Sequence, residues 1–269
     1  MDMHRIYRAI AGWRPLIRRS PLVLTAAAIL LLTALPAQAA RPSTIVTWKD
    51  WGPYVGKQLP DRGIASAIAR EAFAPIDKDV SVQFRPWNRA YREARKGMHL
   101  GAFPYAYNEE RAEDFLFTAP LFTTSIRLFA TRKHIEPNTR LKAIKDPSVC
   151  LPQGYNTRVA ESLFKQTRLV IKRPRAMVNC MHMLRFGRVD LVLVSERVGE
   201  FIINHEQELA HEDFFILSRT IETPVHIMVS RALPDPQSVV STLNEQIARM
   251  KANGRIQSVF DRFDANSAQ

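Results

Sequence analysis

The segment from residue 80 to residue 103, VSVQFRPWNRAYREARKGMHLGAF, contains the pattern that decides the fold class. Its first five residues alternate apolar and polar side chains, which predicts a strand, and Pro86 ends that strand. Residues 87–96 predict a helix that ends at Gly97, and residues 100–103 predict the next strand. A strand, a helix and a strand in this order are typical of a parallel sheet.

The same alternation continues on both sides of this segment. Toward the N-terminus, residues 44–47 predict a strand and residues 63–73 predict a helix with one apolar face. Strands and helices alternate again over residues 149–217, between an extended crossing segment at 127–131 and a further strand at 225–229. Two helices end the chain. We therefore expect an α/β protein of two lobes, each a mostly parallel sheet flanked by helices, with a two-strand hinge.

The first 39 residues have the features of a secretory signal peptide. A cluster of arginines precedes a charge-free apolar run from Leu22 to Leu35, and Ala37-Gln38-Ala39 matches a small-x-small cleavage signal. The apolar run is shorter than the roughly 20 residues of a membrane-spanning helix, which disfavours an anchor. Arg18-Arg19 is followed by Ser20-Pro21, which favours general secretion over the twin-arginine route. We expect a periplasmic protein, cleaved near Ala39 and free of a lipid anchor.

The net charge of +12 invites a nucleic-acid interpretation, but part of it lies in the signal peptide. Removing the five Arg and one Asp of residues 1–39 leaves 33 basic and 25 acidic residues, a net charge of +8. The densest basic run, Lys172-Arg173-Pro174-Arg175, has neither interleaved aromatic residues nor the spacing of a DNA-binding motif. We interpret it as a solvated basic face and expect no nucleic-acid partner.

The chain has two cysteines, Cys150 and Cys180, and both lie in the exported part. An oxidising compartment favours a disulfide between them over two buried thiols. The bond would close a loop of about 30 residues, which stabilises a fold by roughly 3.5 kcal/mol.

Several motifs together resemble the periplasmic solute-binding proteins of polar amino-acid ABC transporters, solute-binding family 3. Residues 50–56, DWGPYVG, followed by Gly63 and a helix, are similar to the opening of that family. Residues 108–120, NEERAEDFLFTAP, look like its signature, in which an Arg precedes F-S/T-x-P. Further matches are Gln153-Gly154, Gly187-Arg188-Val189-Asp190, Leu243-Asn244 and Asn253-Gly254. The order and spacing of these motifs over the whole mature chain carry the resemblance.

The resemblance implies a type II periplasmic binding protein that closes its two lobes over a small-molecule solute. Residues 40–130 and 224–269 would form lobe 1, and residues 131–223 would form lobe 2. The implied partner is an inner-membrane ABC transporter permease, and we expect the protein to act as a monomer without a cofactor.

The resemblance also implies site residues. Arg111 stands where the family's Arg grips the ligand carboxylate, for which a planar guanidinium is suited. Trp51 matches an aromatic wall, whereas Trp87 fits either the cleft or the core. Tyr155, Asn156 and Thr157 match a loop that binds an anion at a helix N-terminus, although Asn156 or Thr157 could equally be an ordinary helix cap.

Two departures from the family limit the choice of ligand. Ser195, with Glu196 beside it, replaces the Asp that takes the ligand's ammonium group, and Tyr105 and Tyr107 replace a Ser-rich stretch. A buried ammonium without a charged partner is unfavourable. A standard α-amino acid is therefore doubtful, and we expect a small anionic, amino-acid-like or aromatic carboxylate, or another planar organic solute. The predicted ligand-binding residues are Trp51, Trp87, Tyr105, Tyr107, Arg111, Tyr155, Asn156, Thr157, Ser195 and Glu196.

Signatures of catalysis are weak in this sequence. His205 and His211 are not at the spacing of a helical metal pair, and neither a G-x-S-x-G elbow nor a Walker loop is found. We expect no metal site and no enzymatic activity. One alternative is a cleft enzyme similar to cyclohexadienyl dehydratases, with Glu196 or Glu222 as the acid, and another is a ligand-sensing partner of a membrane receptor.

Overall fold

The structure is a computed structural model that describes residues 43–209 and 213–267. The predicted signal peptide and its cleavage position near Ala39 lie outside the described residues and stay a prediction. The described residues belong to one compact unit. No helix in this part of the chain is both long and apolar enough to cross a membrane.

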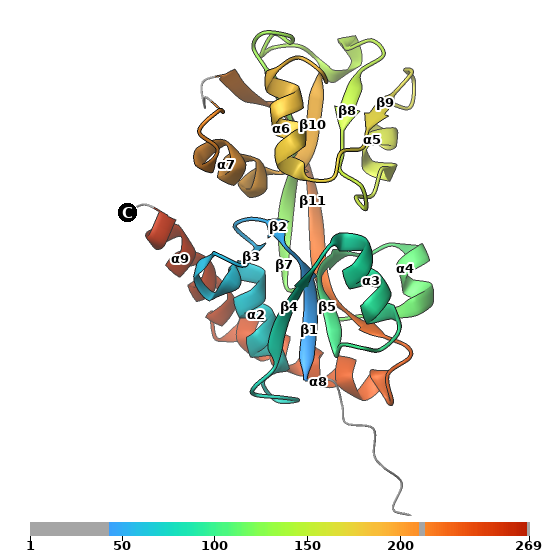
Figure 1. The fold of residues 1–269 in the computed structure, drawn as a ribbon, viewed down its shortest axis with the longest axis vertical. Coiled ribbons are helices and arrows are strands. Elements are labelled where there is room, and N and C mark those ends of the chain that lie inside the picture. Colours follow the sequence, from blue (N-terminus) through green and yellow to red (C-terminus); the bar gives the residue numbers. More distant parts are fainter. Residues whose placement is uncertain (1–42, 210–212, 268–269) are drawn as a thin grey trace, which may run out of the picture. The chain divides into compact units, whose positions relative to one another are not determined.

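The helices and strands alternate as the sequence predicts, and they are drawn in Figure 1. In chain order they are β1 (Thr44–Trp48), β2 (Asp50–Trp51), β3 (Val55–Gly56), a 3-10 turn (Pro60–Arg62), α2 (Ile64–Phe73), β4 (Ser81–Arg85), α3 (Trp87–Arg95), β5 (Gly101–Ala106), α4 (Glu109–Asp114), β6 (Phe115–Phe117), β7 (Phe122–Thr131), a second 3-10 turn (Leu141–Ala143), β8 (Ser148–Cys150), α5 (Arg158–Leu163), β9 (Val170–Lys172), α6 (Met177–Arg185), β10 (Leu191–Ser195), α7 (Glu196–His205), β11 (Phe214–Ser230), α8 (Pro236–Ala252) and α9 (Arg255–Ser267).

One sheet connects both halves of the chain, in the order β4-β1-β5-β11-β7-β10-β8-β9, with β6 also paired to β11. Strands β4, β1 and β5 are parallel to one another, and so are β10, β8 and β9. Between these two groups, β11 and β7 form a long antiparallel pair. Figure 1 shows this pair running from one group of elements into the other.

The register of this central pair places the ends of the parallel strands. Ala106, at the carboxyl end of β5, pairs with Val225 of β11. Ser195, at the carboxyl end of β10, pairs with Ile126, which in turn pairs with Ile221. The carboxyl ends of the two groups therefore point toward each other from positions four residues apart on β11, about 14 Å along the strand.

The sequence predicted two strands, 214–217 and 225–229, where the structure has the single 17-residue strand β11. Pro224 directly precedes the second of these predicted strands, and a proline has no N–H for a ladder. In the structure Pro224 lies opposite Thr123 of β7 and the strand continues through it. An antiparallel ladder tolerates a proline wherever the N–H of that residue is not needed.

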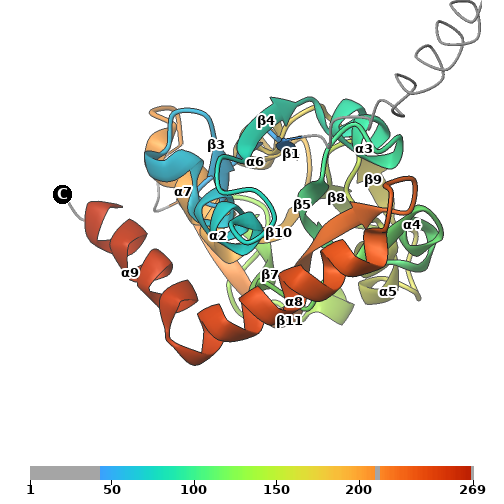
Figure 2. The same cartoon turned by 90° about the horizontal axis from the view of Figure 1, so that it is seen from below.

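Hydrophobic packing follows the same division. A large cluster surrounds β1, β5 and α2 and reaches α6 and α7, and a smaller one packs around Leu128, Val149, Phe164 and Leu191. Seen from below, α8 and α9 follow each other at an angle (Figure 2). Helix α8 packs against α2, β6 and β11, and α9 packs against α2 and α8. Each parallel group is thus covered by helices, as parallel sheets require.

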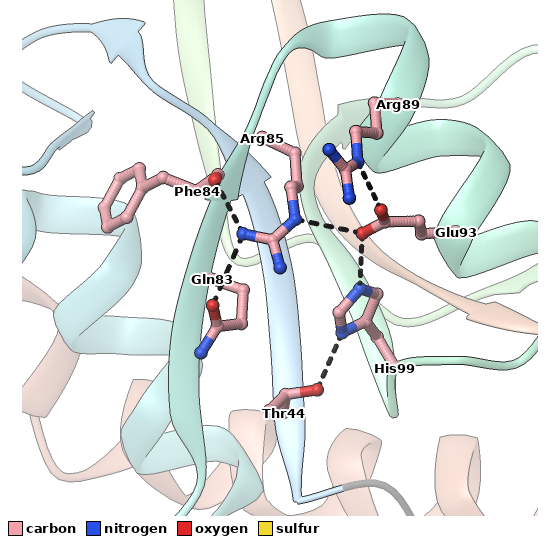
Figure 3. Close-up of polar contacts among 7 residues, drawn as sticks. All are labelled: Thr44, Gln83, Phe84, Arg85, Arg89, Glu93 and His99. Atoms are coloured by element: carbon pink, nitrogen blue, oxygen red, sulfur yellow. Dashed lines mark hydrogen bonds and ion pairs between the residues drawn. The ribbon is translucent and has the colours of Figure 1, made fainter.

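A polar network ties α3 to β4 and β1 (Figure 3). The Glu93 carboxylate accepts hydrogen bonds from Arg89 Nε at 2.5 Å and from Arg85 Nε at 3.1 Å, and His99 Nε2 lies 3.2 Å from it. The other ring nitrogen of His99 lies 2.7 Å from Thr44 Oγ1. The bond from Arg89, together with the other donors, lowers the pKa of Glu93 to about 2.

We predict that Glu93→Gln lowers the free energy of unfolding by about 1 kcal/mol at pH 7. The value is small because solvent screens the ion pairs of Glu93 with Arg85 and Arg89. Since the folded pKa is lower than the ordinary 4.5, the stabilisation is present above pH 4.5 and is lost as the pH falls toward 2. Urea unfolding at pH 7 and pH 3 measures the difference between variant and wild type. Glu245→Gln, on the exposed face of α8, is the control, and a pH-independent difference would contradict the assignment.

The predicted disulfide is confirmed. Cys150 at the end of β8 is bonded to Cys180 in α6, and both side chains are fully buried. The bond therefore fastens a helix to the sheet of the second group.

We predict that the Cys150→Ala, Cys180→Ala double variant loses about 3.5 kcal/mol of stability, since the unfolded chain is no longer cross-linked. This corresponds to a fall in Tm of roughly 10 °C. Thermal unfolding of both proteins measures it. Two free thiols in the unfolded, unreduced wild-type protein would refute the bond itself.

Candidate ligand-binding site

A cavity of about 140 Å³, here named the aromatic cavity, lies at the carboxyl ends of both groups of parallel strands. Ligand crevices form at such ends in open α/β sheets. Its lining residues are Trp48, Trp51, Trp87, Pro104, Ala106, Arg111, Thr124, Ile126, Leu151, Gly154, Tyr155, Asn156, Val159, Leu193, Val194, Ser195, Thr223 and Val225. Six of the ten predicted ligand-binding residues are among them.

Aromatic rings form one wall of this cavity. The rings of Trp48 and Trp87 are in direct contact, and Trp48 meets Trp51 edge-on at 5.7 Å between ring centroids. Tyr155 faces Trp87 at 6.2 Å from the other half of the chain. Trp87, for which the sequence left cleft and core equally open, lines the cavity and also packs against Tyr105. Such a wall suits a flat apolar body.

Arg111 lies at the edge of the aromatic wall. Its backbone N–H donates to Oδ1 of Asn108, the N-cap of α4, at 2.7 Å. Its Nη1 donates to the carbonyl oxygen of Ala106 at 2.9 Å, and its guanidinium carbon lies 5.2 Å from the ring centroid of Tyr105 and 5.7 Å from that of Trp87. These contacts hold the side chain against the cavity.

The charge of Arg111 is poorly compensated. No carboxylate among the described residues lies within ion-pair distance of its guanidinium. Burial lowers its pKa, and the nearby tyrosines and Glu110 oppose that change. A guanidinium that is partly desolvated and has no anionic partner is suited to bind an anionic group of a ligand.

Tyr105 is in the wall behind the cavity rather than in its lining. Its ring is buried, its hydroxyl has no hydrogen-bond partner in the part of the chain that the structure describes, and burial raises its pKa. In the same part of the chain, the buried Nε1 of Trp51 has no partner either, and Trp51 does line the cavity. The indole N–H is a donor that a bound ligand could satisfy.

Three further predicted residues lie outside the aromatic cavity. Tyr107 is 56% exposed and packs against Phe117. Thr157 lines an adjoining cavity, described below. Glu196, the first residue of α7, is ion-paired with Arg127 at 2.9 Å and lines another cavity, of about 740 Å³, beside α9. Ser195 lines both that cavity and the aromatic cavity.

Asn156 acts as a local cap in this structure. Its Oδ1 accepts a hydrogen bond from the backbone N–H of Arg158 at 3.0 Å, at the start of the six-residue helix α5. Asn156 lines the aromatic cavity as well. For Asn156, a role as a helix cap and a position in the predicted anion-binding loop are therefore compatible with each other.

Gly154 allows the two halves of the chain to approach at the cavity. Its φ is +87°, and a Cβ atom there would lie 2.1 Å from Cδ1 of the Trp87 indole. Any side chain at this position would push the loop away from the aromatic wall.

We predict that Gly154→Ala destabilises the fold by roughly 2 to 4 kcal/mol, because it adds a clash to the strain of a positive φ. Gly254→Ala is the matched control, since Gly254 has φ of +73° but no atom within 4 Å of a Cβ. It should lose only about 1 kcal/mol. Urea unfolding measures both variants. Equal losses of unfolding free energy in Gly154→Ala and Gly254→Ala would show that Gly154 does not touch Trp87.

Sequence reasoning missed Trp48. The prediction ended a strand and began a loop near this residue, which is the usual position of a ligand contact in a parallel sheet. Its position directly after an apolar strand was the available signal. Among residues 43–209 and 213–267, no three His, Cys, Asp or Glu side chains come together in a way that could hold a metal ion.

No family model matches the sequence, and no curated protein matches it. Solved structures do share the fold. A periplasmic binding protein of an arginine transport system from Legionella pneumophila aligns over 82% of this chain and 98% of its own, with a TM-score of 0.69 and 13% identity. An amino-acid ABC transporter substrate-binding protein from Streptococcus pneumoniae, bound to L-arginine, aligns over 82% and 94%, with a TM-score of 0.67 and 16% identity.

A third similar structure is a histidine kinase sensor domain with similarity to periplasmic binding proteins. It aligns over 82% of this chain and 94% of its own, with a TM-score of 0.66 and 20% identity. The chain therefore has the type II periplasmic binding protein fold, and the predicted fold class is confirmed. The similar structures are binding proteins and a sensor domain, and at these identities the likeness shows the fold alone.

Proposed function

We propose that this chain is a periplasmic solute-binding protein that captures a small carboxylate in the aromatic cavity and delivers it to an inner-membrane ABC transporter. The observation that carries the proposal is Arg111, a desolvated guanidinium at the cavity edge with no carboxylate partner among the described residues. A ligand carboxylate would supply the missing anion through two parallel hydrogen bonds.

The lining of the cavity favours an anionic, flat ligand over a cationic amino acid. Arg111 is the one charged side chain among the described lining residues, so a ligand ammonium group would find no carboxylate there. The indoles offer stacking area for an aromatic or planar body. Two of the similar structures are arginine-binding or belong to an arginine transport system, so arginine is an informative comparison ligand.

The proposed location outside the cytoplasm rests on several observations that agree. The fold is that of extracytoplasmic binding proteins, and the Cys150–Cys180 disulfide is compatible with an oxidising compartment. The arginine-rich and apolar start of the sequence supports export by a signal peptide.

A second candidate function is ligand sensing for a membrane receptor. The alignment with a histidine kinase sensor domain favours it, because that domain uses the same fold in a signalling protein. Ligand capture in the cavity is common to both candidates. A direct binding assay of the loaded protein with a transporter or with a receptor distinguishes them.

The dehydratase-like alternative has little support from the geometry. Glu196 is paired with Arg127, and Glu222 is exposed and accepts a hydrogen bond from Ser125. Neither carboxyl group lines the aromatic cavity. A catalytic acid must be within hydrogen-bond reach of the substrate.

We predict that one class of carboxylate raises the Tm of the purified protein. A ligand at a hundred times its Kd adds about 2.7 kcal/mol, which corresponds to roughly 5 to 10 °C. The screen compares aromatic acids, aliphatic dicarboxylates, neutral amino acids and arginine. Arg111→Ala should weaken binding of the best acid by roughly 2 to 5 kcal/mol.

Arg92→Ala is the control for that variant, because Arg92 is exposed on α3 and lines none of the cavities described above. It should leave the affinity unchanged. Unchanged affinity in Arg111→Ala, or a response to arginine alone, would contradict the carboxylate assignment.

A further inference from the structure

A second cavity of about 420 Å³ adjoins the aromatic cavity and contains a second guanidinium. The two cavities share Trp87, Arg111, Gly154, Tyr155 and Asn156. Arg173, which directly follows β9, also lines the larger one, named here the arginine cavity. This position is again a carboxyl end of the parallel strands.

Arg173 is only partly satisfied. Its Nη2 donates to the carbonyl oxygen of Tyr155 at 3.0 Å, whereas its Nη1 is buried and has no hydrogen-bond partner within residues 43–209 and 213–267. No carboxylate among the described residues pairs with it, and burial lowers its pKa. A desolvated donor without an acceptor is unfavourable until a ligand provides one.

This environment differs from the solvated basic face that the sequence predicted for residues 172–175. Lys172 and Arg175 are exposed, in agreement with that prediction. Arg173 between them is half-buried against the loop at Tyr155. The prediction is therefore wrong for Arg173, because the turn after β9 directs this side chain inward while its neighbours face solvent.

The acidic residues that line the arginine cavity do not neutralise the two guanidiniums. Glu110 and Glu161 are both exposed, and neither forms an ion pair with Arg111 or Arg173 among the described residues. Arg158 adds a third positive charge at the rim. The cavity thus has more positive than negative side chains, which attracts anions.

The two guanidiniums come from opposite groups of strands. Arg111 is in α4, beyond β5, and Arg173 follows β9. Each donates a hydrogen bond from one nitrogen to a backbone carbonyl, that of Ala106 or of Tyr155, and neither forms an ion pair with a carboxylate of the described residues. A ligand with one acidic group could compensate one of them only.

Building on the proposed function, we propose that the solute is a dianion with a planar body and two carboxylates, one bound by Arg111 and the other by Arg173. Such a ligand contacts both groups of strands at once. Its binding energy therefore favours the arrangement in which both arginines face the same cavity.

Calorimetric titration with matched pairs of acids tests this. Benzoate is compared with the three benzenedicarboxylates, and butyrate with succinate, so that each pair differs in the number of acidic groups. We expect the best dicarboxylate to bind at least about tenfold more tightly than its monocarboxylate partner, since it gains a second charge-assisted pair.

The variants separate the two arginines. Arg173→Gln keeps a donor for the Tyr155 carbonyl and should abolish the dicarboxylate advantage, measured as the ratio of the dicarboxylate affinity to the monocarboxylate affinity of the same variant. Arg111→Ala should weaken both acids. Lys172→Ala is the control, because Lys172 is in the same basic run, is exposed and lines neither the aromatic nor the arginine cavity; it should change neither affinity. Circular dichroism and Tm of each variant show whether the fold is retained.

The outcomes distinguish this inference from the proposed function. Arg111-dependent binding with equal affinity for mono- and dicarboxylates, or a dicarboxylate advantage that survives in Arg173→Gln, overturns the role of Arg173 and leaves the proposed function standing. Binding of arginine or neutral amino acids with no binding of any acid overturns both.

Discussion

Strands β7 and β11 form the antiparallel pair on which the rest of the structure depends, because both parallel groups of strands are hydrogen-bonded to it. β11 pairs with β5 on one side, and β7 pairs with β10 on the other. Because β5 and β10 are both antiparallel to the strand that they contact, the two parallel groups run in opposite directions. The register of the pair then brings the carboxyl ends of both groups toward its middle, and the loops that follow those ends line the aromatic cavity.

The region where the carboxyl ends of the two groups meet is aromatic and positively charged. The strand ends bring aromatic rings to one wall and guanidiniums to the rim, and the described acidic residues near them are exposed or paired elsewhere. Both Arg111 and Arg173 lie where burial disfavours their charge. Under the proposed function, a ligand anion would replace the lost solvation of both guanidiniums and would favour the arrangement in which they face the same cavity.

Other contacts between the two groups are also close. Gly154 lies against the indole of Trp87, and a Cβ at Gly52 would lie 2.4 Å from the ring of Phe201 in α7. Arg197 of α7 forms two hydrogen bonds, at 2.6 and 3.1 Å, with the carboxylate of Asp264 in α9. Small residues and a bidentate ion pair thus support the same approach that the ligand would favour.

The sequence by itself determined the local features of this protein: the alternation of strands and helices, the helix ended by Gly97, the disulfide between Cys150 and Cys180, and the candidacy of Arg111 and Trp51. The alternation and the end of the helix follow from spacing and residue type within short segments. The disulfide followed from the expected oxidising compartment, and the candidacy of Arg111 and Trp51 followed from the family resemblance. Only the tertiary structure decided that β11 continues through Pro224, that Trp48 and Arg173 line the cavities, and that Tyr107 and Glu196 do not line the aromatic cavity. The physical reason is that periodicity encodes which face of an element is buried, whereas the register between strands far apart in sequence decides which loops meet.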